Sequence, residues 1–256
     1  MKDARIGVAV IAENEADRLP RLIDSISFAR EIVVVDSGST DETPSVCTRL
    51  GARVIHHPWE GYGGQKQFAM EALDADWILN LDADEVVPVP LAREMTDAVA
   101  AAPPECSGFS MPRCSYYLNR WIRHGGWYPD RKVRLVRRGK GRWSRDPLHE
   151  RLIIDGKVTP LSHPLHHYVY RNIAGQVATI NRFSDAAASE KGPKGAGYLF
   201  LGLLHAGIKF FETYFWKCGF LDGCAGMVIA ANSSWYVFLK HAKAWERSLK
   251  IRDRYG

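Results

Sequence analysis

Cysteines are few in this sequence, and their spacing gives them no shared role. The 256 residues include five: Cys47, Cys106, Cys114, Cys218 and Cys224, with no CxxC pair. An odd number without close pairs disfavours a disulfide framework or a zinc site and is typical of a reducing compartment. We therefore expect a cytoplasmic protein that is stabilised by its hydrophobic core, which a chain of this length can bury.

The sequence also lacks a strong excess of one charge and a long apolar run. Lys and Arg number 34 against 29 Asp and Glu, and 46% of the residues are hydrophobic. This composition excludes a disordered or fibrous chain. The first apolar run turns acidic at Glu13, so it makes a poor secretory signal. Near the other end, the 17 uncharged residues 223–239 are at the short limit of a membrane-spanning helix.

Charge is nevertheless concentrated in one region. Residues 113–157 hold 13 Lys and Arg against 4 Asp and Glu, a local net charge of +9. Such a stretch binds anionic partners or forms a solvated basic face. Five aromatic residues are interleaved with the arginines: Tyr116, Tyr117, Trp121, Trp127 and Trp143. A nucleic-acid-binding protein with base-stacking aromatics is therefore one function class to weigh.

The first 90 residues alternate between strand and helix patterns. Apolar runs typical of buried strands lie at 6–12, 31–36 and 77–81, with a weaker run at 53–56. Between them, helices are expected at 19–26, in the segment that leads to Leu50, and at 65–73. Short connections between alternating elements predict an α/β fold with a mostly parallel sheet covered by helices on both faces.

Acidic residues follow three of these strands. Glu13, Asp36 and the pair Asp82 and Asp84 stand where strands end. Ligands of parallel α/β sheets bind at the carboxyl ends of the strands. Alternation along an extended segment would put Asp82 and Asp84 on one side, where they could share a divalent cation. We therefore predict a site for a nucleotide and a metal at this edge, rather than a helix cap or loop role.

The rest of the chain changes character. Short strands are expected at 108–112, 133–137 and 152–154, between loops rich in Gly, Pro and Arg. The region 197–239 is apolar and aromatic, interrupted by charges in its first half. We interpret it as amphipathic helices lying on a membrane or a partner surface, with membrane contact preferred. The alternative is that these helices pack on the main domain as ordinary core.

Four motifs in this order resemble family 2 glycosyltransferases with the GT-A fold. They are IAENEADRLPRLIDSI, EIVVVDSGSTDET, GQKQFAMEALDADWILNLDADE and DPLHE, within residues 5–151. GGWYPDRKVRLVRR and KCGFLDGCAGMVIA are similar to the lipopolysaccharide core glucosyltransferase branch. The resemblance implies a GT-A domain over 1–190, with a nucleotide-sugar half (1–100) and an acceptor half (101–190). It is followed by a helical, membrane-associating region over 191–256.

The resemblance also implies roles for individual residues at the donor site. The UDP-sugar contacts would come from Ala12, Glu13, Asp36, Lys66 and Asp82, with residues 37–41 shaping the nucleoside pocket. Asp84 would be the direct ligand of Mg²⁺ or Mn²⁺, and His167, chosen over His163 and His166, would add a metal or phosphate contact. The alternative for Lys66 is a surface lysine without a binding role. Glu85 could be an acidic residue at the start of a helix.

For the acceptor side, the resemblance points to Glu150 as the general base of an inverting transfer, with Asp146 as second choice. A salt bridge to a neighbour such as Arg151 is the alternative for Glu150. The expected acceptor contacts are Trp127, Asp130, Arg131 and Arg134. The implied reaction moves glucose from UDP-glucose to an anionic, lipid-linked saccharide at the inner face of the cytoplasmic membrane, without a nucleic-acid partner.

Overall fold

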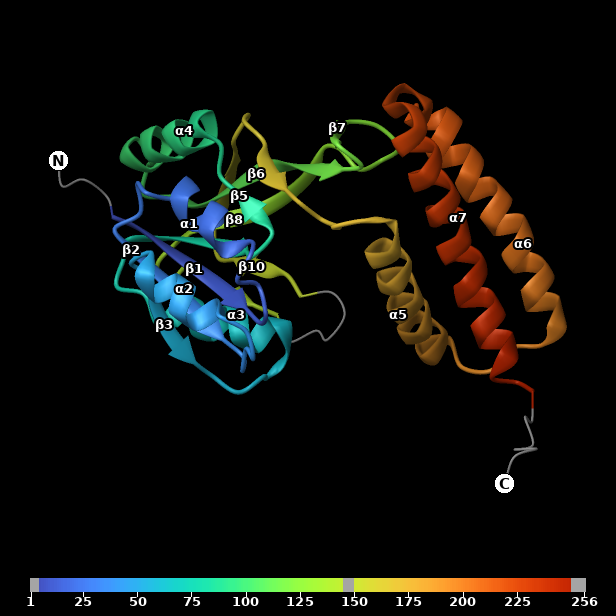
Figure 1. The fold of residues 1–256 in the computed structure, drawn as a ribbon. Coiled ribbons are helices and arrows are strands. Elements are labelled where there is room, and N and C mark those ends of the chain that lie inside the picture. The colour runs from blue at the N-terminus through green and yellow to red at the C-terminus, as the bar shows by residue number, and fades with distance from the viewer. Residues whose placement is uncertain (1–4, 145–149, 250–256) are drawn as a thin grey trace. The chain divides into compact units, whose positions relative to one another are not determined.

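The computed structural model describes residues 5–144 and 150–249, which form two compact units. The first unit runs to Arg113 and includes Asp130–His167, and the second holds Cys114–Pro129 and the chain from Tyr168 onward. The domain boundary expected at residue 190 differs from this division. Residues 168–190 belong with the C-terminal helices because helix α5 (Ile173–Lys191) packs against helix α7 (Gly223–Glu246) (Figure 1).

The first unit opens with the parallel half of its sheet. Its strands are β1 (Ile6–Ala12), β2 (Glu31–Asp36), β3 (Arg53–His56) and β4 (Trp77–Asp82), joined through α1 (Leu19–Ser25), α2 (Thr43–Arg49) and α3 (Gly61–Glu71). The strands lie in the order β3-β2-β1-β4, all parallel. These strands are runs of Val, Ile and Leu because both of their faces are covered. The predicted α/β architecture is confirmed.

The other half of the sheet is mixed. It contains β5 (Glu85–Val86), β6 (Cys106–Tyr117), β8 (Asp130–Arg137), β11 (Lys157–Pro160) and β12 (Leu165–His167), with helix α4 (Val89–Ala100) between β5 and β6. Strand β8 is antiparallel to both β4 and β6, and β12 pairs antiparallel with β5. Strands β9 (Gly141–Trp143) and β10 (Leu152–Ile154) form a separate antiparallel pair. The β5–β12 pairing brings the end of the first unit back beside the acidic motif.

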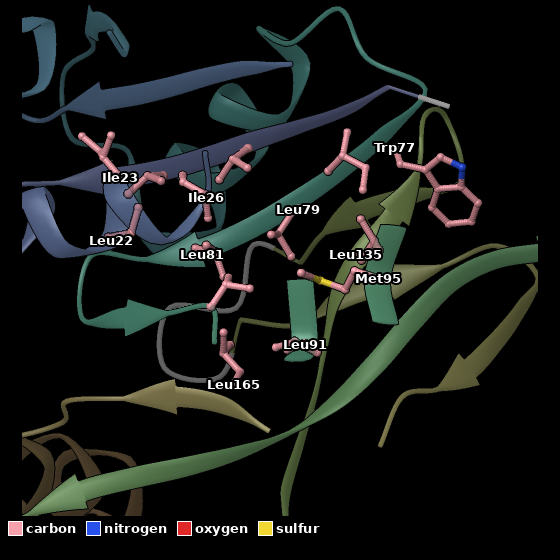
Figure 2. Packing of buried hydrophobic residues seen from close by; sticks show 14 of the residues in the cluster. Leu22, Ile23, Ile26, Trp77, Leu79, Leu81, Leu91, Met95, Leu135 and Leu165 are labelled. Carbon is pink, nitrogen blue, oxygen red and sulfur yellow. The ribbon is translucent and has the colours of Figure 1, made fainter. Parts of the chain in front are cut away.

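Two hydrophobic clusters cover the two faces of the sheet. The larger one packs α1 and α4 against β1 and β4, and Figure 2 shows Leu22 and Ile23 of α1 with Leu79 and Leu81 of β4. The smaller one packs α3 against the opposite face, where Ala9 alternates with the residues of the first cluster. Successive side chains of β1 and β4 thus point alternately into the two hydrophobic clusters. This packing holds the ends of the two strands in a fixed register.

The second unit is mainly helical. It contains β7 (Arg120–Ile122), α5, α6 (Ala196–Phe211), a π-helical turn (Glu212–Trp216), a 3₁₀ turn (Gly219–Asp222) and α7. Helices α6 and α7 lie side by side (Figure 1). Gly202 permits this contact, because a Cβ there would lie 2.5 Å from the Cβ of His241. No helix within the described ranges has the length and apolarity that crossing a membrane requires.

The larger cluster predicts a large effect of shortening one central side chain. Leu79 is fully buried in β4, so Leu79→Ala should lower the free energy of unfolding by about 2–5 kcal/mol. Urea titration followed by tryptophan fluorescence measures this, since Trp77 lies in the same cluster. Leu50→Ala, at an exposed leucine, should change stability by no more than about 0.5 kcal/mol. Equal effects of the two substitutions would contradict the proposed core.

Candidate active site

The ends of three neighbouring strands meet at one edge of the first unit. The pairing register sets Ala12 of β1 opposite Asp36 of β2, and Ile11 opposite Asp82 of β4. Glu13 follows Ala12 and is exposed. The sequence-predicted residues of the first, second and fourth strands are thus brought together, because parallel strands present the same ends to one crevice.

Asp36 organises the loop that follows β2. Its side chain is buried and accepts backbone hydrogen bonds from Gly38 at 3.0 Å and from Ser39 at 3.2 Å. Asn14, which sequence reasoning missed, holds the same loop from β1: its Oδ1 accepts the Thr40 backbone N–H at 2.9 Å. Asn14 has a left-handed backbone with φ of 55°, which asparagine tolerates better than most residues. The position of Asn14 two residues after the end of a buried strand was the available signal.

A second missed residue connects this loop to helix α3. Gln65 is fully buried, and its Nε2 donates to Ser37 Oγ at 2.9 Å and to the His57 carbonyl at 3.1 Å. Its Oε1 lies 2.6 Å from His57 Nδ1. The loop after β2 is therefore fixed from both sides. Gln65 lies in the motif GQKQFAMEALDADWILNLDADE, directly before Lys66, and this position was the available signal.

The acidic motif after β4 is a turn, which corrects the extended geometry expected from the sequence. Strand β4 ends at Asp82, Ala83 and Asp84 form the turn, and Glu85 begins β5. The Asp82 backbone N–H donates to Glu85 Oε2 at 3.0 Å, which closes the turn. Asp82 and Asp84 consequently have different neighbours and different environments.

Asp82 lies between two cations. Lys66 Nζ is 2.8 Å from its Oδ1, and Arg134 donates to its Oδ2. Burial by itself would raise the pKa of Asp82, but Arg134 and Lys66 hold that pKa far below its ordinary value. Lys66 is only 7% exposed, so the alternative of a surface lysine does not hold. Asp82 is therefore a permanently ionised group that orders its surroundings.

Arg134 belongs to this buried charge network. It is buried and pairs with Glu85 as well as with Asp82, and Glu85 also meets Arg113 at 3.3 Å. Burial alone would lower the pKa of Arg134, but Asp82 and Glu85 raise it above its ordinary value. This environment differs from the exposed acceptor contact expected of Arg134. Glu85 is fully buried in β5, so its interpretation as a helix-start acid is wrong.

Asp84 and His167, the two predicted metal contacts, lie next to each other. His167 Nε2 in β12 lies 3.3 Å from Asp84 Oδ2, while Arg18 is 3.8 Å from the same carboxylate. His163 instead meets Glu94 at 2.9 Å. His166 neighbours His167, but burial, with help from Arg21, lowers its pKa to about 4. Of the three histidines, His167 is the one paired with the acidic motif.

This donor set fits a divalent cation shared with a phosphate ligand. A carboxylate oxygen and an imidazole nitrogen suit Mn²⁺, and Mg²⁺ accepts one or two carboxylates together with phosphates and water. No cluster of three or more His, Cys, Asp or Glu side chains suited to a metal exists in the described part of the chain. Asp84 and His167 are the residues that could hold a cation here.

Glu150 faces the same charge network. Its Oε1 lies 3.0 Å from Lys66 Nζ, and Lys66 contacts Asp82 at the same time. Lys66 also lies 4.8 Å from the centre of the Trp143 ring. The predicted base is thus joined to the donor edge through one buried lysine. Asp146, the second choice, lies outside the described residues.

The predicted acceptor residues have different partners. Asp130 pairs with Arg113 at 2.7 Å and with Lys132 at 3.0 Å, and Arg131 donates to the Leu161 carbonyl at 3.0 Å. Burial would raise the pKa of Asp130, but these two cations lower it. Trp127 belongs to the second unit, whereas Asp130, Arg131 and Arg134 belong to the first.

Comparison with known proteins decides the family. The sequence model described as Glycosyl transferase family 2 matches residues 7–163. A lipopolysaccharide core biosynthesis glycosyltransferase, LpsC of Rhizobium meliloti, is 34% identical over 95% of this chain and 93% of its own. The chain belongs to glycosyltransferase family 2. It is therefore a glycosyltransferase, and its resemblance to the lipopolysaccharide core branch is confirmed.

Other relatives agree with this assignment. An uncharacterised glycosyltransferase of Rickettsia conorii is 29% identical over 97% of this chain and 93% of its own. The solved mannosyltransferase of Pyrobaculum calidifontis, in complex with GDP-Man and Mn²⁺, matches 95% of this chain and 88% of its own. Its TM-score is 0.56 at 15% identity, which supports the GT-A fold.

The buried network predicts that Arg134 is essential for stability of the first unit. Arg134→Met would leave Glu85 and Asp82 with one cationic partner fewer, so the free energy of unfolding should fall by about 3–5 kcal/mol. Denaturant titration measures this fall. Arg131→Met is the matched control, because Arg131 is exposed, and it should cost at most about 1 kcal/mol. A loss for Arg134→Met no larger than that of the control would refute the network.

Proposed function

We propose that the enzyme transfers glucose from UDP-glucose to a lipid-linked saccharide, such as the inner core of lipopolysaccharide, with inversion and with Mg²⁺ or Mn²⁺. The observation that carries this proposal is the pairing of Asp84 with His167 beside three strand ends in a family 2 glycosyltransferase. The LpsC relative, whose description is lipopolysaccharide core biosynthesis, supports the acceptor class.

The donor nucleoside would bind at the ends of β1 and β2. Ala12 is small and buried there, so a flat base can approach the backbone, while Glu13 and the Asp36 loop offer hydrogen-bonding groups to the ribose. Because Asn14 and Gln65 fix that loop, little conformational entropy remains to be lost when the nucleoside binds. Lys66 and Asp82 would border the diphosphate.

Asp84 and His167 would hold the cation. A divalent cation supplies positive charge that stabilises the leaving diphosphate. Arg18, 3.8 Å from Asp84, adds a further positive group on the same side. Asp82, with its two cationic partners, would set the position of the turn that carries Asp84.

Glu150 would act as the general base. An inverting transfer needs the acceptor hydroxyl to lose its proton as the oxygen attacks. The Lys66 ammonium lies 3.0 Å from Glu150 Oε1 and 2.8 Å from Asp82 Oδ1. Lys66 would therefore orient the base, while Asp82 holds Lys66 in place.

A nucleic-acid-binding function is not favoured. Several cations of the basic stretch already pair with carboxylates, including Arg113 with Asp130 and Arg134 with Glu85. Cations neutralised in this way release few counterions from a phosphate backbone. The exposed arginines of this stretch are better suited to the anionic groups of a saccharide acceptor.

Membrane association is part of the proposal and rests on helix α6. Large apolar side chains form an exposed stripe at helical spacing: Phe200, Leu204, Ile208, Phe211 and Phe215. Gly202 and Ala206, by contrast, are the residues buried on α6. A soluble helix normally buries its larger apolar side chains. An outward apolar stripe is typical of helices that lie in a membrane interface, here on the cytoplasmic side.

The active-site proposal is tested with two conservative variants. Asp84→Asn should reduce metal-dependent UDP release from UDP-glucose by about 100-fold or more, because charge stabilisation of the leaving group is lost. Glu150→Gln should reduce it by about 100-fold or more as well, the range of general-base catalysis. UDP binding by calorimetry should weaken in the first variant and stay near wild type in the second.

Matched controls are the exposed residues Asp24 on α1 and Glu71 on α3. Asp24→Asn and Glu71→Gln should leave both UDP release and UDP binding unchanged. Full turnover in Glu150→Gln would remove that residue from the mechanism. UDP release that is insensitive to EDTA in the wild-type protein would refute the metal dependence.

The membrane proposal is tested by co-sedimentation with phosphatidylglycerol and phosphatidylcholine vesicles. The double variant Leu204→Glu/Ile208→Glu should bind at least about tenfold more weakly, because each buried aliphatic side chain contributes about 1.5–3 kcal/mol. Leu50→Glu, at an exposed leucine outside the stripe, should bind as wild type. Wild-type protein that sediments with neither vesicle would contradict the proposal.

A further inference from the structure

A cavity of about 330 Å³ lies within the second unit, apart from the residues assigned to the donor site. Helix α5 contributes Gln176 and Thr179, and helix α7 contributes Asn232 and Ser233. Its volume is at the lower end of the range for small-molecule sites. The cavity therefore suits a small ligand rather than an extended chain.

A buried amide forms the polar part of its wall. Gln176 is 4% exposed, and its Oε1 accepts hydrogen bonds from Tyr117 Oη at 2.6 Å and from Asn232 Nδ2 at 2.5 Å. These two donors occupy the oxygen, whereas Gln176 Nε2 donates to no residue in the described ranges. Because Gln176 lines the cavity, its amide N–H groups are fixed donors for a ligand. The carbonyl of Asn232 lies on the same wall and can accept.

Aromatic rings supply the apolar part of the wall. Trp127 and Tyr170 line the cavity with their ring centres 6.3 Å apart, and Trp127 also stacks on Tyr117 at 5.9 Å. Tyr236 of α7 adds a third ring to the lining. Rings held in this way present flat apolar faces beside polar edges. Aromatic faces next to fixed amides and hydroxyls match a sugar, whose C–H faces are apolar and whose rim is hydroxylated.

The charge of the cavity lining bears on whether the ligand is a sugar or a phosphate. Lys209 is the one charged residue among the described residues that line the cavity, and its Nζ pairs with Glu212 Oε2 at 3.0 Å. Glu212 also pairs with Lys217, so the two lysines share one carboxylate. The other described residues of the lining are uncharged, and uncharged polar and aromatic groups suit a neutral ligand better than a phosphate. A lipid chain is disfavoured because it would cover Gln176, Asn232 and their neighbours without hydrogen bonds.

We propose that this cavity binds one neutral sugar residue of the acceptor saccharide. Trp127, predicted from sequence as an acceptor contact, then acts together with Gln176, Asn232 and Tyr236 of the helices. That the sugar belongs to the acceptor rests on the proposed function, whereas the binding of a sugar by the cavity does not. The cavity is thus an anchoring subsite for the acceptor, separate from the transfer chemistry.

The test is NMR titration of the full chain, ¹⁵N-labelled, with the methyl glycosides of glucose, galactose and mannose. Saturable shifts of the Trp127 indole and the Asn232 side-chain amide are expected for at least one glycoside, with a Kd in the millimolar range that a single sugar supports. Inorganic phosphate should cause no such shifts. Absence of shifts with all three glycosides, or larger shifts with phosphate, would overturn the proposal.

Filling the cavity gives the matched comparison. Ser233→Phe should lower glycoside affinity at least about tenfold, while Ala231→Phe, at an exposed position of the same helix, should leave it unchanged. Thr179→Leu is a second filling variant, for use if circular dichroism shows that Ser233→Phe does not fold. Undiminished glycoside binding in a folded filling variant would show that the sugar binds elsewhere, and the proposal would fail.

UDP release without acceptor separates this proposal from the proposed function. The filling variants should hydrolyse UDP-glucose at the wild-type rate, because the residues assigned to the donor site belong to the first unit. Hydrolysis without glycoside binding would overturn the cavity assignment alone. Glycoside binding without any UDP-sugar hydrolysis would overturn the proposed function and support sugar binding by the cavity.

Discussion

The buried pairing of Asp82 with Lys66 and Arg134 is the interaction on which the rest of the site depends. It joins three elements, β4, α3 and β8, at the edge where strands end. Through Lys66 it reaches Glu150, and through Arg134 it reaches Glu85, which closes the turn that carries Asp84. Buried charges are costly unless each is paired, so displacement of one member would leave several charges uncompensated. The network therefore holds the proposed metal ligand and the proposed base in one arrangement.

The two units carry different kinds of side chains, which suit different parts of the proposed reaction. The first unit concentrates carboxylates and cations at strand ends, which suits a charged nucleotide and a metal. The second unit offers amides, hydroxyls and aromatic rings around its cavity and an apolar stripe along α6, which suits sugars and a membrane interface. The proposed reaction would use a charged donor and a lipid-linked acceptor, so separate surfaces of different polarity are physically reasonable.

The differences between sequence and structure arise where long-range pairing overrides local pattern. Asp82 and Asp84 alternate in sequence, yet the chain turns between them because Glu85 accepts the Asp82 amide and pairs with arginines from β6 and β8. Arg134 looks like a free basic group in a basic stretch, but its place in β8 next to β4 buries it beside two carboxylates. The grouping of residues 168–190 with the C-terminal helices likewise depends on the packing of α5 against α7, and helix packing is not a local property.

The sequence by itself determined the class of fold, the enzyme family and the strand ends that meet at the candidate site. Hydrophobic runs predict the strands, and parallel strands present the same ends at one edge. The motifs in their order match glycosyltransferase family 2. Only the tertiary structure decided which charges pair, that His167 meets Asp84, and that Gln65 and Asn14 support the loop after β2. The paired side chains belong to residues tens of positions apart in the sequence. Local periodicity carries no information about which of these distant residues pair.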